Sequence, residues 1–181
     1  QIGTFLAVRT STIGFSIPTI AAERNSPDLY KFIRNGWKSR LAASLFLLLS
    51  NRITVQLNSY KKKYPFFLRS RIVTIANPVR QIYLTAYPNE TKNTPKRILN
   101  VGRLSFQKNQ LFLINAFAII AKSNPEWILT IIGEGEYRES IKNLISERDL
   151  TEQIELIGTV KDVDYWYKNS SFLAFPSLWE G

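Results

Sequence analysis

The feature that most constrains the fold is a regular alternation of strand-like and helix-like segments in the C-terminal half of the chain. Four short runs rich in Ile, Leu, Val and Phe have the composition of buried strands, at 97–101, 127–132, 154–157 and 172–175. Three segments between them have a pattern that predicts helices, at 108–122, 136–148 and 162–168. Strands that alternate with helices form parallel sheets. The sequence therefore predicts a doubly wound α/β sheet of four strands.

The N-terminal half shows a second, looser alternation of the same kind. Strands are predicted at 16–22, 53–57 and 71–76, with helical patterns at 29–49, interrupted at Gly36, and at 60–67. Within these, the apolar run 41–49 is too short to span a bilayer, which takes about 20 residues. It predicts a buried helix.

Two bodies joined by a linker follow from these patterns. Asn77-Pro78 ends the first alternation, and residues 77–97 combine Pro, Asn and charges without periodicity, which is typical of a linker. We therefore expect two Rossmann-like domains, at 1–76 and 98–181. Because the chain has no Met and opens inside an apolar run, we expect an internal piece of a longer protein, with both domains incomplete and no activity of its own.

The charge is unevenly distributed along the chain. The net charge is +10, yet residues 1–97 carry 16 Lys and Arg against three acids, whereas residues 98–181 carry eight against 11. A strongly basic half is attracted to polyanions, either membrane phospholipid or nucleic acid. The other interpretation is a solvated basic surface without a ligand. Since the chain contains no Cys and no His, these residues offer no thiolate nucleophile, imidazole base or His-ligated zinc.

Small residues follow each strand of the C-terminal series. The strands end at Gly102, at Gly133 and Gly135, at Gly158 and Thr159, and at Pro176-Ser177. Ligands of open parallel sheets bind beyond the carboxyl ends of the strands, and glycine there permits close approach of the backbone.

Two cations lie on either side of the loop that opens the first helix of this series. Arg103 and Lys108 would meet an anion at the helix N-terminus, where free N–H groups and a partial positive charge favour phosphate. Spacing alone is equally compatible with two surface cations.

Two further motifs resemble ligand sites, but the residues in and around them argue against that function. Gly133-Glu-Gly135 lacks the third glycine of a dinucleotide fingerprint, and the acidic residues around it would repel a pyrophosphate. Asp162-Val-Asp164 resembles a D-x-D metal site but opens a predicted helix, where Asp is a favoured cap.

Four segments taken together resemble a known family. They occur in order and at fitting distances, as Val101-Gly-Arg-Leu-Ser-Phe-Gln-Lys-Asn109, Ile131-Ile-Gly-Glu-Gly135, Ile157-Gly-Thr-Val160 and Pro176-Ser-Leu-Trp-Glu-Gly181. This set resembles the group 1 (family 4) glycosyltransferases of the GT-B fold, closely over residues 98–181. Upstream, Ile75-Ala-Asn-Pro-Val79 resembles the family's exit from its N-terminal domain, and Glu23-Arg-Asn25 resembles a stretch in members that build bacterial surface polysaccharides.

The resemblance implies a retaining transfer of a hexose or N-acetylhexosamine from a nucleotide sugar, expected to be UDP-linked, without metal or cofactor. Arg103 and Lys108 match the family's pair on the donor diphosphate. Glu180 matches the first Glu of its E-x7-E motif, which contacts the donor sugar, so these three are the expected catalytic residues. The expected donor-binding residues are Gly102, Gly133, Gly135, Gly158, Thr159, Val160, Ser177 and Gly181.

The same resemblance sets expectations for partners and location. It assigns residues 1–76 to an acceptor-side domain and 98–181 to a nucleotide-sugar-binding domain. The acceptor is expected to be a glycan or lipid-linked, and the protein to be cytoplasmic and peripheral on the inner face of the cell membrane. Anionic membrane is an expected partner and nucleic acid is not. The family's Gly-rich loop, its active-site His and the second Glu of E-x7-E do not occur in this sequence.

An alternative function is a non-catalytic basic α/β module that binds anionic membrane or nucleic acid. Such a module predicts exposed aromatic rings interleaved with basic residues. Only Lys61-Lys-Lys-Tyr-Pro-Phe-Phe67 has this pattern, and it is equally compatible with a helix end that packs its rings inward.

Overall fold

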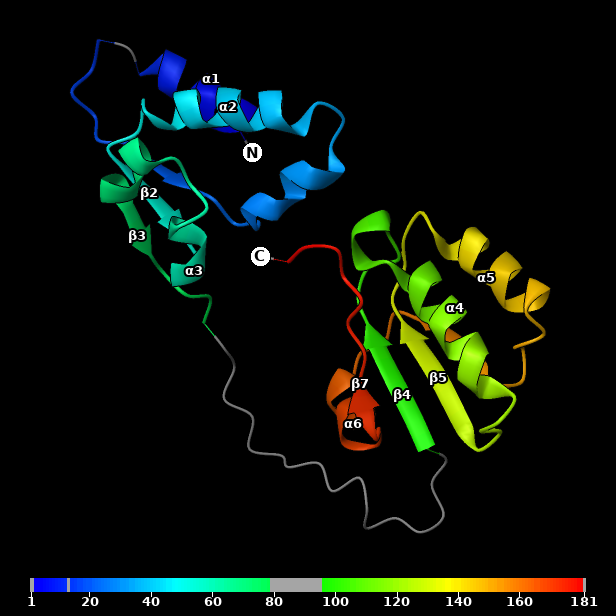
Figure 1. Ribbon diagram of the computed structural model, residues 1–181. Coiled ribbons are helices and arrows are strands. Elements are labelled where there is room, and N and C mark those ends of the chain that lie inside the picture. The colour runs from blue at the N-terminus through cyan, green and yellow to red at the C-terminus, as the bar shows by residue number, and fades with distance from the viewer. Residues whose placement is uncertain (1, 13, 79–95, 181) are drawn as a thin grey trace. The chain divides into compact units, whose positions relative to one another are not determined.

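Figure 1 shows the computed structural model of the protein, which describes residues 2–12, 14–78 and 96–180. The chain divides into two compact units. The first contains Gln1–Arg80 together with Trp179–Gly181, and the second contains Gln81–Leu178. Most of the linker predicted at 77–97 lies outside the described residues, and so does Gly181.

The second unit is a four-stranded parallel sheet with the strand order β6-β5-β4-β7. Its strands are β4 (Lys96–Val101), β5 (Trp127–Ile132), β6 (Ile154–Gly158) and β7 (Phe172–Leu173). The intervening elements are the 3-10 helix η3 (Phe106–Lys108) and the helices α4 (Gln110–Ala121), α5 (Arg138–Glu147) and α6 (Val163–Lys168). The predicted alternation and the parallel sheet are confirmed.

The core of this unit lies between the sheet and two helices that run beside each other, α4 and α5 (Figure 1). Leu99, Leu129 and Ile131 are fully buried on the strands. Helix α4 contributes a buried stripe at Ile114, Phe117 and Ala121, whose spacing of three and four residues places them on one face. Although α4 is apolar on nearly every side, only this face is covered within the unit.

The first unit contains a three-stranded parallel sheet in the order β1-β2-β3. Its elements are α1 (Ile2–Ser11), β1 (Ile20–Ala22), η1 (Pro27–Phe32), α2 (Gly36–Leu47), β2 (Arg52–Val55), α3 (Asn58–Lys61), η2 (Phe66–Arg71) and β3 (Ile72–Thr74). The core is formed by Ile53 and Val55 on the central strand, with Leu47 and Leu68 packed against them. No helix within the described ranges is long and apolar enough to cross a membrane.

The prediction of a buried helix at 41–49 is wrong in its burial. Helix α2 is present, but the side chains of Leu41 and Leu45 are 52% and 54% exposed. The buried face instead presents Ala43, Ser44 and Leu47. The small residues let the helix pack closely on the rest of the unit, whereas the leucines on its other sides are exposed to solvent.

The break predicted at Gly36 is confirmed and has a steric cause. A Cβ atom at this position would lie 1.6 Å from the carbonyl oxygen of Tyr30. Only glycine fits where η1 ends and α2 begins. The element before the break is a 3-10 helix rather than an α-helix.

Other boundaries in the first unit differ from the sequence-based expectation. The strand predicted at 16–22 is confined to 20–22, and the helix predicted at 60–67 is divided between α3 and η2. Pro65 lies at the division, where it precedes the first residue of η2. Proline disfavours helical geometry in the residue before it, which accounts for the interruption.

Candidate functional site

Three of the predicted turns lie together at the carboxyl edge of the second sheet. The backbone N–H of Gly102, after β4, donates to the carbonyl of Ile132 at 2.9 Å. The N–H of Gly133, after β5, donates to the carbonyl of Gly158 at the same distance. The turn after β4 is therefore bonded to the last residue of β5, and the turn after β5 to the last residue of β6. The N–H of Leu104 also donates to the carbonyl of Glu134 at 3.0 Å, which joins the first two turns directly.

The glycines of these turns are required by the contact between the loops. A Cβ atom at Gly133, where φ is +144°, would lie 2.0 Å from the carbonyl oxygen of Gly102. A Cβ atom at Gly135 would lie 2.2 Å from the carbonyl oxygen of Leu104, whose N–H donates to Glu134. From the sequence, these glycines were explained by a close approach of the backbone to a ligand. The packing of one loop on the other already accounts for both of them.

Lys108 lies across the first of these turns. A Cβ atom built on Gly102 would meet the Cδ and Cε atoms of Lys108 at 3.5 Å, so the lysine stem runs over the glycine. Lys108 belongs to η3, and α4 begins at Gln110 rather than at 108 as predicted. Arg103 is exposed next to Gly102. Both predicted cations therefore flank the turn between β4 and α4.

A buried network of hydrogen bonds holds this turn from inside the unit, and the sequence did not predict it. The Nε2 atom of Gln110, whose side chain is almost fully buried, donates to the carbonyl of Arg103 at 3.0 Å and to Oδ1 of Asn100 at 3.4 Å. Asn100 in turn donates to the carbonyl of Ala174 at 2.7 Å. The sequence contained one signal of this network, because Gln110 has the helical spacing of the buried residues Ile114, Phe117 and Ala121.

The segment after β7 is attached to the same turn. The N–H of Leu178 donates to the carbonyl of Gln107 at 2.9 Å, and Nδ2 of Asn109 donates to the carbonyl of Pro176 at 3.3 Å. Ser177 is thereby held next to η3. Its buried Oγ atom has no hydrogen-bond partner within the described part of the chain.

The acidic residue of the second turn is already paired. Glu134 forms an ion pair with Arg138 at 2.8 Å, one turn along the chain. Gly158 has a φ of +89° and lies against this carboxylate, since a Cβ atom there would be 2.8 Å from Oε1 of Glu134. Thr159 is exposed and Val160 half-buried, directly after Gly158.

Asp162 caps α6, as the sequence predicted. Its side chain accepts a hydrogen bond from the backbone N–H of Tyr165 at 3.1 Å. Across the described ranges no three His, Cys, Asp or Glu side chains are grouped so that they could hold a metal ion.

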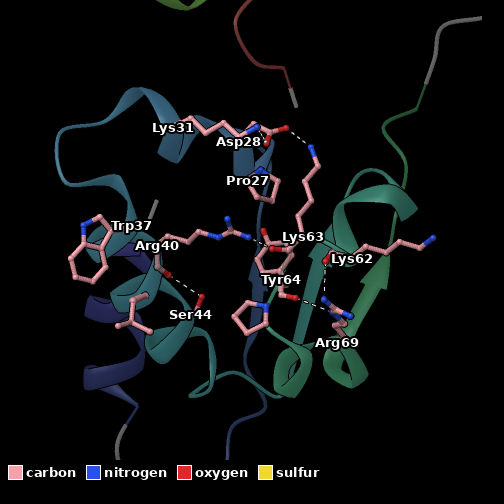
Figure 2. Close-up of a pocket in the computed structure, with 12 residues that line it drawn as sticks. Pro27, Asp28, Lys31, Trp37, Arg40, Ser44, Lys62, Lys63, Tyr64 and Arg69 are labelled. Atoms are coloured by element: carbon pink, nitrogen blue, oxygen red, sulfur yellow. Dashed lines mark hydrogen bonds and ion pairs between the residues drawn. The ribbon is translucent and has the colours of Figure 1, made fainter.

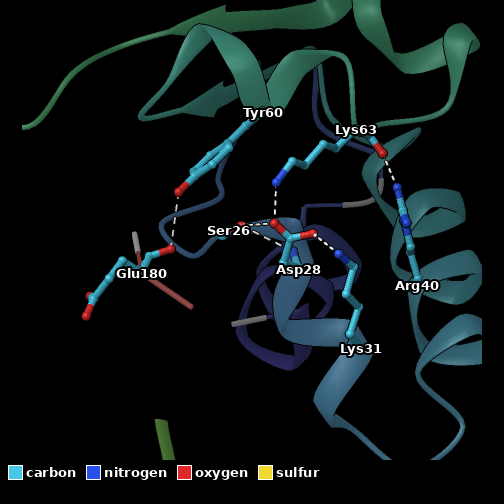
Figure 3. Close-up of polar contacts among 7 residues, drawn as sticks. All are labelled: Ser26, Asp28, Lys31, Arg40, Tyr60, Lys63 and Glu180. Carbon is cyan, nitrogen blue, oxygen red and sulfur yellow. Dashed lines mark hydrogen bonds and ion pairs between the residues drawn. The ribbon is translucent and has the colours of Figure 1, made fainter. Parts of the chain in front are cut away.

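Glu180 belongs to the first unit, whereas Arg103 and Lys108 belong to the second. Its backbone carbonyl accepts a hydrogen bond from the hydroxyl of Tyr60 at 3.3 Å (Figure 3). It accepts a second one from the backbone N–H of Ser26 at 2.8 Å. The preceding residue, Trp179, stacks on Phe32 with 5.1 Å between ring centroids. The backbone at 180 is thus fixed while the carboxylate is exposed.

Glu23 is a half-buried carboxyl group that follows β1. Desolvation raises its pKa, although the hydroxyl of Tyr64 donates to it at 3.4 Å. It lines a cavity of about 170 Å³ at the carboxyl ends of the first sheet. Nearby, Asn77 accepts hydrogen bonds from Arg24 and Gln56. The sequence offered Glu23 only as part of a resemblance and gave no sign of its burial.

The aromatic residues within 61–67 face in different directions. Tyr64 is buried and Phe66 is 81% exposed. The inward-packing interpretation therefore holds for Tyr64, while Phe66 offers the exposed ring that a nucleic-acid module would use.

Comparisons with known proteins agree with the resemblance seen in the sequence. The family model described as glycosyl transferases group 1 matches residues 86–181. An uncharacterized glycosyltransferase of Haemophilus influenzae is 35% identical over 117 residues, which is 64% of this chain and 32% of the relative. The amylovoran biosynthesis glycosyltransferase AmsD of Erwinia amylovora is 33% identical over 85 residues, 47% of this chain and 24% of the relative.

A third relative has a name that states a lipid-linked substrate. It is the N-acetylgalactosamine-N,N'-diacetylbacillosaminyl-diphospho-undecaprenol 4-alpha-N-acetylgalactosaminyltransferase of Campylobacter jejuni, which is 36% identical over 86 residues. The match covers 48% of this chain and 23% of the relative. The chain spans about a third or less of the length of these curated relatives.

Solved structures show the same fold over nearly the whole chain. Staphylococcus aureus TarM, crystallised with UDP, superposes with a TM-score of 0.79 at 18% identity and covers 99% of this chain and 36% of its own. Anabaena HepE, in complex with UDP and glucose, gives a TM-score of 0.73 at 14% identity over 98% of this chain and 51% of its own. The predicted GT-B fold is confirmed, and with the family model matching more than half of its residues, the chain belongs to the group 1 glycosyltransferases.

Proposed function

We propose that the protein is a retaining, metal-independent glycosyltransferase that moves a hexose or N-acetylhexosamine from a UDP-sugar to a glycan or lipid-linked acceptor in surface polysaccharide biosynthesis. The observation that carries the proposal is the joined set of turns beneath Arg103 and Lys108. Family membership supports glycosyl transfer, and the UDP bound in the two solved neighbours supports the choice of nucleotide. The names of the Erwinia and Campylobacter relatives support a polysaccharide or lipid-linked product.

We propose a separate role in this reaction for each residue. Arg103 supplies a guanidinium fork and Lys108 a point charge at the turn before α4, where a diphosphate would accept from both. Negative charge grows on that diphosphate as the glycosidic bond breaks, so cations fixed there lower the barrier. The amides near Gly102 and Gly133 would lie below the nucleotide, with the base next to Gly158, Thr159 and Val160.

Glu180 and Ser177 are the remaining donor contacts that the resemblance to the family implies. An ionised carboxylate accepts hydrogen bonds only, which suits sugar hydroxyls and not a diphosphate. We therefore assign Glu180 to the donor sugar and the two cations to the phosphates. The buried Oγ of Ser177 would donate to the same ligand, and Gly181 would offer its backbone amide.

A donor screen tests the proposal in the full-length protein. We expect release of UDP from a UDP-hexose or UDP-N-acetylhexosamine, unchanged by EDTA, and an α-linked product when the donor is α-linked. Full loss of activity in EDTA with recovery in Mn²⁺ would contradict metal independence. Nucleotide release no greater than that of the Arg103→Ala/Lys108→Ala double variant with every donor would contradict the transfer function.

Membrane association forms a second part of the proposal. The basic N-terminal half would hold the protein on an anionic bilayer, with about 1 kcal/mol for each well-placed Lys or Arg. Flotation with anionic and neutral vesicles measures this directly. Equal binding to both would contradict an electrostatic contact, and tighter binding to RNA than to vesicles would favour the non-catalytic module, for which the exposed Phe66 is the supporting observation.

A further inference from the structure

The first unit contains an open groove of about 790 Å³, and none of the residues assigned above to the donor lines it. This volume lies in the range of small-molecule binding sites. Three segments form its walls: η1, the first two turns of α2, and the stretch from 62 to 69. The lining residues are Pro27, Asp28, Lys31, Trp37, Arg40, Leu41, Ser44, Lys62, Lys63, Tyr64, Pro65 and Arg69 (Figure 2).

The lining is strongly basic. It includes five Lys and Arg residues against a single carboxylate, Asp28. That carboxylate pairs with Lys63 and, at 3.0 Å, with Lys31 (Figure 3). Hydrogen bonds from these two lysines lower the pKa of Asp28 to about 2, so it stays ionised at neutral pH. The other three cations of the lining are Arg40, Lys62 and Arg69, and the groove has no second carboxylate to balance their charge.

Two of these cations are held in place by neutral groups. Arg40 donates to the backbone carbonyl of Lys63 (Figures 2 and 3). Arg69 donates through Nε to the carbonyl of Tyr64 and through Nη2 to that of Lys62, both at 2.9 Å. A carbonyl fixes the direction of a guanidinium without cancelling its charge. These arginines therefore differ from solvated surface cations, which have no fixed direction.

We propose that this groove binds phosphate groups of an anionic ligand, with the oriented guanidinium groups of Arg40 and Arg69 as the recognising side chains. Lys31 and Lys63 share one carboxylate and so add a net positive charge beside them. Oriented guanidinium groups match phosphate oxygens in a bidentate fashion and lose little entropy on binding. Trp37, 69% exposed at the rim, provides a flat apolar surface for the part of the ligand next to the phosphates. Phospholipid headgroups and phosphates of a water-soluble ligand share this chemistry.

Calorimetric titration of the full-length protein with inorganic triphosphate tests the site. UDP is present at saturation, because the second unit is proposed to bind a diphosphate as well. We expect Arg40→Gln to weaken triphosphate binding about tenfold, the effect of losing one hydrogen bond to a charged group. The matched control is Arg34→Gln, which removes the same charge from an exposed residue outside the groove lining and leaves affinity unchanged.

A second variant is needed in case Arg40→Gln fails to fold, because this change removes the hydrogen bond from Arg40 to the carbonyl of Lys63. The side chain of Lys31 is 72% exposed and its ion pair lies at the surface, so Lys31→Gln is expected to fold and still weaken triphosphate binding several-fold. Equal weakening by Arg34→Gln would show a long-range charge effect and overturn the site. Absence of triphosphate binding, or tighter binding of citrate, would overturn it too.

Two further arms identify the source of the phosphate. If vesicles of phosphatidylglycerol compete with triphosphate and their binding falls in Arg40→Gln but not in Arg34→Gln, the ligand is a lipid headgroup. If both variants bind vesicles equally while only Arg40→Gln loses triphosphate, the groove takes a water-soluble phosphate ligand. Each result supports the groove as a phosphate site, and neither depends on sugar transfer.

Discussion

Gln110 donates a hydrogen bond from its buried side chain to the backbone carbonyl of Arg103 at 3.0 Å. The contact fixes the main chain of an exposed cation from inside the unit. Because the same Nε2 atom also reaches Asn100, the direction of the Arg103 turn is tied to the central strand β4. Gln110 is thus a positioning residue for the proposed diphosphate contact.

Replacing Gln110 with Ala is expected to lower the free energy of unfolding by about 1–3 kcal/mol, because the carbonyl of Arg103 loses its buried partner. Turnover is also expected to fall, since the Arg103 turn is no longer held. Asn115→Ala on the same helix is the control, because Asn115 bonds to Leu111 and Arg148 away from the turn. Thermal unfolding and UDP release measure both effects. If the two variants reduce turnover equally, the positioning role is wrong.

Arg103→Ala and Lys108→Ala are each expected to reduce turnover about 10²–10³-fold, the usual effect of removing one donor that stabilises developing charge. Lys122→Ala is the control, since Lys122 is exposed just after α4 ends, at the far end of that helix. Initial rates of UDP release at saturating donor provide the measurement. Activity within a few-fold of the unmodified protein would remove that residue from the site.

Gly133→Ala is expected to destabilise the second unit by about 2–6 kcal/mol. Backbone strain at a positive φ contributes about 1–3 kcal/mol, and the clash with the carbonyl of Gly102 adds about 1–3 kcal/mol. Gly14→Ala separates the two contributions. Gly14 also has a positive φ, of +91°, but a Cβ atom there meets nothing within 4 Å. Urea unfolding should show a clearly larger loss for Gly133→Ala, and equal losses would refute the steric explanation.

The stability of the first unit is expected to decline as the pH falls from about 4 to about 2. Lys63 and then Lys31 lower the pKa of Asp28 from 3.8 to about 2 in the folded state. A carboxyl group with a lowered pKa stabilises the fold fully above its unfolded pKa and loses that effect as it is protonated. Asp28→Asn should flatten this part of the stability profile, whereas Glu147→Gln in the second unit should not. Unfolding midpoints followed by circular dichroism across this range decide the matter.

Glu180→Gln is expected to impair turnover more than nucleotide affinity. The amide keeps the shape of the carboxylate but accepts weaker hydrogen bonds from sugar hydroxyls. Affinity for free UDP, measured by calorimetry, should be unchanged because the diphosphate is assigned to other residues. An equal loss of UDP affinity, or no loss of turnover, would rule out the assignment to the sugar.

Most of the architecture could be predicted because it depends on local pattern. The β-branched runs at β4 and β5 and the glycines after them fix strands, turns and the sheet edge where the predicted cations lie. Burial was harder to predict where it depends on distant partners. Glu23 is covered through Tyr64, 41 residues further along the chain, and Gln110 is buried by a strand and a turn that precede its helix. The exposure of Leu41 and Leu45 reflects which face of α2 meets the sheet, which composition does not specify.

The close packing of the turns after β4 and β5 limits which of their residues can change during evolution. Gly133 and Gly135 pack on the backbone of the turn after β4, and neither can gain a Cβ atom without displacing a carbonyl of that turn. The side chain of Thr159, by contrast, is exposed and can be exchanged without moving this backbone. Divergence in ligand preference is therefore expected at position 159, while Gly133 and Gly135 are inherited unchanged.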